Sequence, residues 1–344
     1  YDDPRVTYDF ADIVSDDSIE CVVEAMGGLE PAHTFIMESL AAGKHVVTAN
    51  KAVVAAFLPE FCAQAEESGV GFFIEATSGG GIPWIASIEK ARRIDRIERI
   101  SGILNGTSNY IVDRMAKDGA EFADVLAQAQ ALGYAEADPS ADIDGIDVAN
   151  KCVISSTVAF GTLCRRDIPV HGIRNLTKAD LDTFADLGYA VRLMARAARD
   201  DDGYAACVEP VLLPLASVEG NVPDNFNIAT LVGTPVGPLK FYGQGAGALP
   251  TGNAMVQDLV DCAGGERPVY PTGETPPWNP GLLRADYVFR TAAALPADTP
   301  GTAVEVAPGY VSVGGLSATE AAALADALLA EDPATLMAAV ADVD

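Results

Sequence analysis

Residues 19–26 read IECVVEAM, a short apolar run that ends at a pair of glycines. Two similar runs follow, HVVTAN at 45–50 and GVGFFIEAT at 69–77. Short apolar runs bounded by glycine are typical of buried strands in a parallel sheet. The segments between them have the length and pattern of helices. The order strand, helix, strand, helix, strand therefore predicts a doubly wound α/β sheet.

A Gly-rich stretch, SGGGIP at 78–83, ends this module, and the hydrophobic pattern beyond it predicts an α+β region. Over the whole chain, helices are expected at about 31–42, 52–68, 83–92, 107–117, 121–132, 142–160, 177–198 and 252–263, and strands also at about 96–104, 204–218 and 236–243. Residues 266–280 are rich in Pro and Gly and predict a linker. A tail follows, with strand-like YVFRT and GYVSVGG and an Ala-rich helix from about residue 317.

The usual opening of a dinucleotide-binding domain is not seen. Such a domain normally begins with a strand, a G-x-G-x-x-G loop and a helix. No such pattern precedes residue 19, and the first residue is Tyr1. GQGAGA at 243–248 lies far downstream and ends in Ala248, where the pattern has its third glycine. We therefore expect the first part of the nucleotide-binding domain to be missing, which puts cofactor binding in doubt.

Composition narrows the class of partner and the compartment. The 49 acidic residues outnumber the 22 basic ones, and the net charge of −27 disfavours both nucleic acid and anionic membranes as partners. The pattern predicts a halophilic surface, and an ordinary acidic cytosolic protein is the alternative. Six cysteines without a C-x-x-C pair indicate reduced thiols in the cytoplasm. Three scattered histidines are too few for a histidine zinc site.

The segment 133–151, GYAEADPSADIDGIDVANK, concentrates charged side chains. Asp147 and Lys151 are four residues apart and share one helix face. They form either an ordinary surface ion pair or a substrate clamp beside a proton donor. Glu136 and Asp142 add carboxylates, with Asp144 nearby. Such a group suits an ammonium-bearing substrate, and it also suits a solvated acidic loop.

Two loops after predicted strands carry further candidates. Lys51 follows HVVTAN, and the carboxyl ends of strands form the ligand crevice in open α/β sheets. An exposed loop lysine is the alternative. EATSGGGI at 75–82 places Glu75 before a flexible backbone whose carbonyls could hold a hard cation. The alternative there is a tight turn that needs the conformational freedom of glycine.

Six segments, in this order, resemble the signature sequences of the homoserine dehydrogenase family: GKHVVTANKA, EATSGGGIP, GILNGTSNYI, GYAEADPSADIDGIDVANK, HGIRNL and GQGAGALPTGNAMVQDL. The whole match runs from about residue 20 to residue 264, roughly 70% of the chain. The resemblance implies NAD(P)-dependent interconversion of L-homoserine and L-aspartate 4-semialdehyde, a step toward threonine and methionine. The expected fold is an incomplete Rossmann-like nucleotide-binding domain (1–76 and 238–264), an α+β catalytic and dimerisation domain (77–237), and a linker and C-terminal tail (265–344).

The resemblance also implies roles for particular residues. Lys151 and Lys51 match catalytic lysines, with Lys151 as the proton donor to the carbonyl oxygen, and we expect the two to depress each other's pKa. The substrate-binding carboxylates match Glu136, Asp147 and Asp142. The NADP or NAD contacts match Lys51, Gly133, Glu136 and Gly245. A monovalent cation, Na⁺ or K⁺, would be bound by Glu75 and by the backbone carbonyls of Ser78, Gly80 and Ile82. A small-molecule substrate and a homodimer or a dimer of dimers are expected.

The sequence departs from the family pattern in two places. Gln244 replaces the proline of a GPGAG motif, which would loosen a cofactor loop. Beyond about residue 280 the chain does not resemble the regulatory ligand-binding domain of some members, although YVFRT is similar to its first strand. Two alternatives remain open: a non-catalytic or inactive fragment of such an enzyme, and a related amino-acid semialdehyde dehydrogenase or reductase.

The charge imbalance predicts stabilisation by salt. Screening weakens the mutual repulsion of like charges, so the melting temperature should rise between about 0.1 M and about 2 M KCl. Differential scanning calorimetry checks this. A melting temperature that stays flat or falls over this range would contradict the halophilic interpretation.

Overall fold

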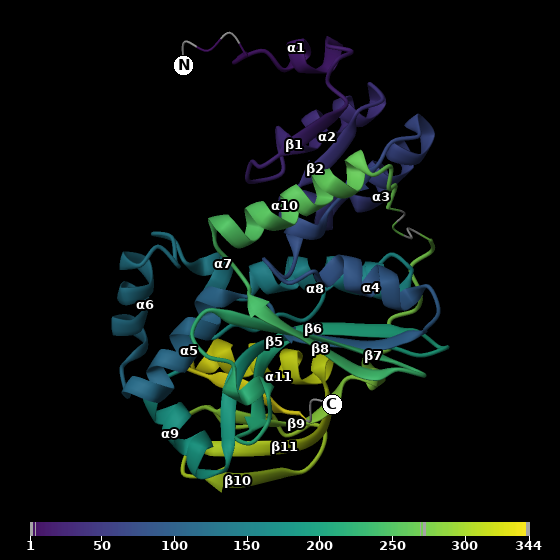
Figure 1. Ribbon diagram of the computed structural model, residues 1–344. Helices are drawn as coiled ribbons and strands as arrows, with labels where there is room; N and C mark the ends of the chain where they lie inside the picture. Colours follow the sequence, from purple (N-terminus) through teal and green to yellow (C-terminus); the bar gives the residue numbers. More distant parts are fainter. Residues whose placement is uncertain (1–2, 4, 269, 271–272, 342–344) are drawn as a thin grey trace.

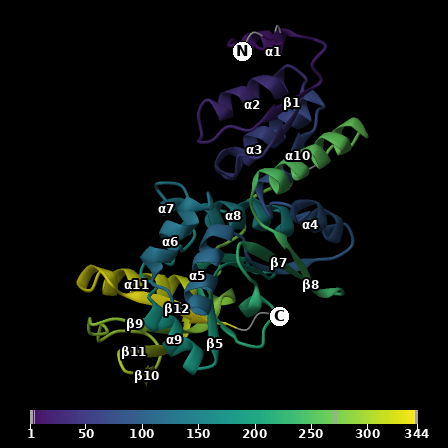
Figure 2. The ribbon, with the colours of Figure 1, turned by 60° about the vertical axis from the view of Figure 1, so that its left-hand side comes forward.

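The computed structural model describes residue 3, residues 5–268, residue 270 and residues 273–341. A three-stranded sheet with its helices forms one body, and a nine-stranded sheet forms the other (Figure 1). Helices α4 (Trp84–Arg92) and α8 (Ile146–Phe160) lie between the two bodies, as Figures 1 and 2 both show. The fold is therefore an α/β domain set on an α+β domain.

The smaller sheet is parallel throughout. Its order is β1 (Cys21–Glu24), β2 (His45–Thr48) and β3 (Phe72–Phe73), with α2 (Ala32–Ala41) and α3 (Lys51–Ser68) as the crossovers. A short helix, α1 (Phe10–Ser15), precedes β1, and α10 (Ala248–Ala263) returns to this body from far along the chain (Figure 2). The strand–helix alternation expected from the sequence is confirmed.

The helix that follows β2 has a clear start and stop. The Asn50 side chain accepts a hydrogen bond from the Val53 backbone N–H at 3.2 Å, and Gly69 ends the helix with φ of 69°. Between them, Val53, Leu58 and Phe61 are buried against the sheet side. This cap places Lys51 in the first turn of α3, directly after the carboxyl end of β2.

The larger sheet has the order β10-β11-β9-β12-β6-β5-β4-β7-β8. Its strands are β4 (Ile97–Ile103), β5 (Tyr189–Arg199), β6 (Tyr204–Pro214), β7 (Phe226–Gly233), β8 (Gly237–Gln244), β9 (Arg284–Arg290), β10 (Ala303–Ala307), β11 (Tyr310–Ser317) and β12 (Leu336–Val340). The other helices are α5 (Gly106–Asp118), α6 (Phe122–Ala131), α7 (Ser140–Ile143), α9 (Lys178–Asp186) and α11 (Ala318–Glu331), with 3₁₀ turns η1 (Glu75–Thr77), η2 (Glu219–Asn221) and η3 (Pro280–Leu282). Helix α8 packs on β4, β5 and β6.

The predicted helix at 177–198 is wrong in its second half. Helix α9 stops at Asp186, and Gly188 turns the chain with φ of 91°. The following residues form β5, which pairs with β6 over eleven consecutive residue pairs. Strand β7, unassigned from the sequence, pairs on the other side of β4. In both segments, pairing with neighbouring strands determines the structure, and the local sequence pattern alone does not indicate it.

The segment expected as a C-terminal tail is part of the large sheet. Strand β12 lies between β9, to which it is antiparallel, and β6, to which it is parallel. Hydrogen bonds from β9 and β11 to α9 hold the segment in place. Arg290 Nε donates to Asp180 Oδ1 at 2.6 Å, and the Tyr310 hydroxyl donates to the same oxygen at 2.8 Å. Describing this segment as a tail is therefore wrong.

None of the described helices combines the length and apolarity needed to cross a membrane.

Candidate active site

Two lysines and one aspartate meet where the two bodies face each other. Lys151 Nζ lies 2.7 Å from Asp147 Oδ2, and Lys51 Nζ lies 2.9 Å from Asp147 Oδ1. Lys151 also donates to the Leu104 carbonyl at 2.7 Å. The Asp147 and Lys151 side chains are almost buried, whereas the Lys51 side chain is 42% exposed. One carboxylate thus binds an ammonium group from each body.

Asn105 organises the same cluster and was not singled out from the sequence. Its Nδ2 donates to Asp142 at 2.6 Å and to Asp147 at 2.9 Å, and its Oδ1 caps α5 by accepting from the Ser108 N–H. The signal was present in GILNGTSNYI, where an asparagine precedes the predicted helix as a cap would. Only the structure shows that its other amide atom reaches the carboxylates.

The charges of this cluster stabilise one another. Burial alone would raise the pKa of Asp147, but the ammonium groups of Lys151 and Lys51 and the Asn105 bond lower it below its usual range. Asp147 in turn raises the pKa of Lys51. The expectation that the two lysines depress each other's pKa is therefore wrong for Lys51, because a carboxylate lies between them. Burial raises the pKa of Asp142, against the Asn105 hydrogen bond.

The remaining residues of segment 133–151 lie around this cluster in different ways. Glu136 is exposed on the loop after α6, and its charge contributes to the raised pKa of Lys51. Gly133 turns the same loop with φ of 76°, in open space. Asp144 faces away and binds Arg174 at 2.6 Å. The group therefore places two lysine side chains, one almost buried and one partly exposed, among carboxylates.

The loop expected to contact the cofactor touches the loop expected to hold a cation. The Gly81 N–H donates to the Gln244 carbonyl at 3.0 Å. A Cβ on Gly80 would come within 2.4 Å of the Gly245 carbonyl carbon. The Gly80 position therefore requires glycine, and the two loops pack backbone against backbone.

The Glu75 carboxylate binds the first turn of α4. It accepts hydrogen bonds from the N–H groups of Ile85 (3.1 Å) and Ala86 (2.7 Å) at the start of α4. Burial raises its pKa to about 7, against these hydrogen bonds. The Ile82 carbonyl, meanwhile, accepts from the Trp84 N–H at 2.7 Å. Glu75 thus joins the first body to α4 of the second.

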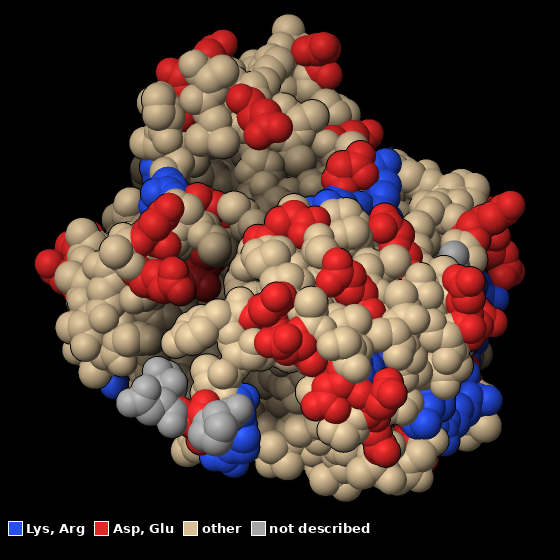
Figure 3. Space-filling view, turned by 90° about the horizontal axis from the view of Figure 1, so that it is seen from above, with Lys and Arg blue, Asp and Glu red and all other residues tan. Residues whose placement is uncertain are grey.

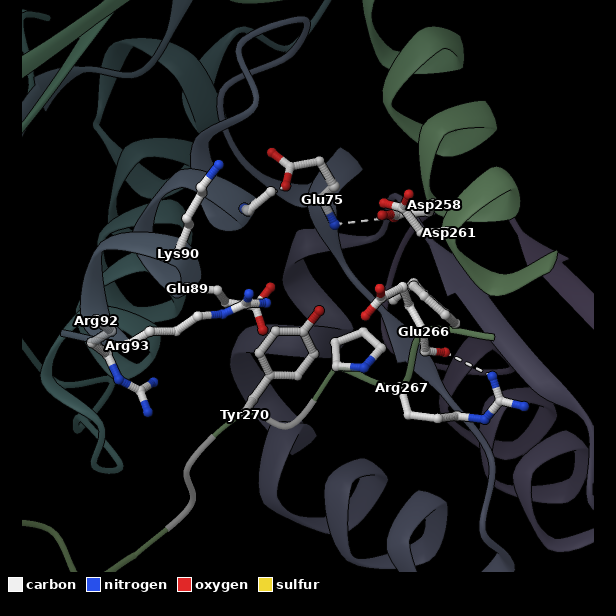
Figure 4. A pocket seen from close by; sticks show the side chains of 13 residues that line it. Glu75, Glu89, Lys90, Arg92, Arg93, Asp258, Asp261, Glu266, Arg267 and Tyr270 are labelled. Atoms are coloured by element: carbon white, nitrogen blue, oxygen red, sulfur yellow. Dashed lines mark hydrogen bonds between the residues drawn. The ribbon is translucent and has the colours of Figure 1, made fainter. Parts of the chain in front are cut away.

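Glu75 also lines a cavity of about 660 Å³ between α4 and α10 (Figure 4). Glu89, Asp258 and Tyr270 face the same space. Burial raises the pKa of Glu89 to about 7 and that of Asp258 to about 8, and the neighbouring carboxylates add to both shifts. No set of three or more His, Cys, Asp or Glu within the described part of the chain is placed to hold a metal ion. The lysine–aspartate cluster is not part of this cavity.

The sequence and the fold can now be compared with known proteins. A family model described as homoserine dehydrogenase matches residues 83–260, and one described as the NAD-binding domain of homoserine dehydrogenase matches residues 1–75. The chain belongs to the homoserine dehydrogenase family. It therefore combines a Rossmann-like nucleotide-binding domain with the catalytic domain of that family.

Individual members of the homoserine dehydrogenase family agree with this assignment. Homoserine dehydrogenase of Synechocystis is 44% identical over 75% of this chain, and that of Pseudomonas aeruginosa is 42% identical over 74%. The matched parts are 61% and 59% of those relatives, so the chain spans about 60% of their length. A crystal structure of homoserine dehydrogenase from Thiobacillus denitrificans has a TM-score of 0.85 and 35% identity, covering 98% of this chain and 85% of that one. A hyperthermophilic archaeal homoserine dehydrogenase mutant in complex with NADPH has a TM-score of 0.66 and 26% identity, covering 77% of each chain.

The raised pKa of Glu89 predicts a pH-dependent stability. Between its ordinary pKa and about 7, the folded chain keeps a proton that the unfolded chain has released. The stability that this proton contributes is complete at acid pH and is lost as the pH rises through about 7. Glu89→Gln removes the titration, so the melting temperature of the variant relative to the original chain should increase from about pH 5 to about pH 8. Glu67→Gln, at an exposed position, is the control and should give a constant difference. A constant difference for Glu89→Gln as well would contradict the prediction.

Proposed function

We propose that the protein acts as a homoserine dehydrogenase, interconverting L-homoserine and L-aspartate 4-semialdehyde with NADP or NAD. The observation that carries the proposal is the buried Lys151–Asp147 pair, bridged to Lys51 and held by Asn105. A surface ion pair would be solvated and would have little reason to engage a second ammonium group from another body. Here burial and two oxygen acceptors fix the position of one lysine nitrogen.

Lys151 has the position of a general acid, because its side-chain nitrogen is almost buried and held by two oxygen acceptors. Its ammonium group has three N–H donors, and Asp147 and the Leu104 carbonyl take two of them. The third N–H remains for the oxygen of the aldehyde, to which Lys151 transfers a proton during reduction and from whose alcohol it takes one during oxidation. Asp147 keeps this nitrogen oriented through the hydrogen bond at 2.7 Å. When bound, the nicotinamide nucleotide supplies or accepts the hydride.

Carboxylates around the lysines suit the other groups of the substrate. Glu136 and Asp142 can accept hydrogen bonds from an ammonium group, and Asp147 from a hydroxyl, in charge-assisted bonds. Lys51, half exposed on the nucleotide-binding side, suits both the substrate and the nucleotide. Gly133 and Gly245 suit close approach of the nucleotide to the backbone. The crowding at Gly245 supports this fit, since a side chain there is excluded.

We also propose that Glu75 and the carbonyls of Ser78, Gly80 and Ile82 hold Na⁺ or K⁺. One carboxylate and neutral oxygens suit a monovalent ion better than Zn²⁺, which prefers nitrogen and sulfur ligands. Glu75 already fixes the start of α4, so an ion here would strengthen the junction between the two bodies. Its role would be structural, because Lys151 and Asp147 are bound by other groups.

The wider setting extends the same proposal. We place the enzyme in threonine and methionine biosynthesis, in the cytoplasm, as a homodimer or a dimer of dimers. Acidic side chains are scattered over the face in Figure 3, and basic ones gather at fewer places. Together with the net charge of −27, this supports adaptation to high salt.

Replacing the proposed general acid tests the function. Lys151→Ala should lower kcat by about 10²–10⁴-fold, which is the usual range for loss of a general acid. The fold should persist because Lys51 still neutralises Asp147. Lys117→Ala is the matched control, since Lys117 also follows a buried aspartate, Asp113, by one helical turn but lies in the exposed part of α5. Steady-state rates with homoserine and NADP or NAD measure both variants. Activity of Lys151→Ala within about threefold of the original chain would reject the assignment.

The cation proposal is tested by exchanging the salt at constant ionic strength. NaCl or KCl should give a higher melting temperature than tetramethylammonium chloride, whose cation is too large for four oxygens at about 2.3–2.9 Å. Glu75→Gln should abolish this difference, while Glu89→Gln, in the neighbouring cavity, should keep it. Equal melting temperatures of the original chain in all three salts would show that the loop is only a turn.

A further inference from the structure

Asn227, on β7, has a buried side chain without hydrogen-bond partners. Its exposed fraction is 0%, and neither Oδ1 nor Nδ2 has a partner among the described residues. Buried amides are nearly always paired, because an unpaired amide loses its bonds to water and gains nothing in return. The position of Asn227 therefore requires an explanation beyond packing.

The strand register places Asn227 beside the proposed active site. Asn227 pairs with Gly243 on β8. On the other side of β7, Ile228 pairs with Ile103 of β4 in antiparallel order, so the next residue after Ile103, Leu104, is the neighbour of Asn227. The Leu104 carbonyl is the acceptor that holds Lys151.

The amide of Asn227 lies directly under the 243–247 loop. A Cβ on Gly245 would come within 1.9 Å of Asn227 Cγ, 2.0 Å of Nδ2 and 2.2 Å of Oδ1. Gly80 lies against the carbonyl of the same Gly245. The loop then continues into α10, whose first turn has no side-chain cap. Asn227 thus supports the backbone of the one loop that links β8, α10 and the Gly80 turn.

Another buried asparagine shows what a purely structural role looks like in this chain. Asn109 is 1% exposed, and its Nδ2 donates to the carbonyls of Val222, Asp224 and Phe226 at 2.9–3.2 Å, while its Oδ1 has no partner among the described residues. It therefore ties α5 to the segment before β7. Asn227 makes no such tie, although its amide lies against the Cα of Gly245 in the 243–247 loop.

We propose that Asn227 is a positioning residue for the 243–247 loop, which hydrogen-bonds to its amide when a nicotinamide nucleotide binds. The inference rests on the proposed function. Binding turns a peptide group of the loop toward Asn227, which donates to its carbonyl from Nδ2 or accepts from its N–H at Oδ1. The same residue borders Leu104, so the nucleotide loop and the acceptor of Lys151 share one support. Without the nucleotide the amide stays unpaired and destabilises the fold.

Asn227→Leu separates this role from a structural one, because leucine keeps the branched shape and removes the polar atoms. The melting temperature of the nucleotide-free variant should be higher by about 1–4 °C, since an unpaired buried amide is lost. The KM for NADPH or NADH should rise about tenfold, as for one lost hydrogen bond, while kcat stays within about threefold. Asn109→Leu is the matched control and should lower the melting temperature. Asn227→Ala adds no volume and should raise the nucleotide KM in the same way.

The results that would overturn this inference differ from those that would overturn the proposed function. A nucleotide KM that is unchanged in either Asn227 variant overturns the inference, even where the original chain is active. A melting temperature of Asn227→Leu lowered as far as that of Asn109→Leu also overturns it, because the amide would then be paired before the nucleotide binds. If the original chain itself shows neither turnover nor binding of the nucleotide, the proposed function fails and this inference fails with it.

Discussion

The bridging of two ammonium groups by Asp147 is the interaction on which the rest of the arrangement depends. A buried carboxylate is costly unless its charge is compensated, and here each oxygen has its own cation. Because one lysine comes from α3 and the other from α8, the bridge also joins the two bodies, together with the Glu75 hydrogen bonds to the start of α4. The proposed chemistry and one of the contacts between the two bodies therefore use the same few atoms.

The local sequence predicted those helices and strands whose residues alone carry the pattern and the end signals of the element. The three parallel strands, the cap-bounded α3 and the acidic turn before α8 all follow from apolar runs and breakers near them in the chain. Strands β5 and β7 could not be predicted in this way. Strand β5 is held between β4 and the adjacent β6, and β7 between β4 and the adjacent β8. Their common partner β4 is distant in sequence from both, so no local pattern indicates this pairing.

In the candidate site, too, the local sequence predicted some features, and others depend on contacts between separate segments. The i, i+4 spacing placed Lys151 beside Asp147, and the strand end placed Lys51 near a crevice, but spacing gave no information about burial. The roles of Asn105 and Asn227 could not be predicted from the sequence, because an asparagine is as typical of a turn or a helix cap as of a buried contact. Their significance depends on which groups surround the amide, and those groups come from other segments: Asp142 for Asn105, and Gly245 for Asn227.

The insertion of β12 beside β6 has a consequence for any shortened form of the chain. Strand β6 is almost entirely buried, and β12 covers the end of its side away from β5. Cutting the chain after the 266–280 segment would remove β12 and leave β6 without its parallel partner near Val211 and Leu212, within an apolar stretch of the strand. Such an edge is a template for intermolecular pairing, so a shortened protein would tend to aggregate although its proposed catalytic residues were all present.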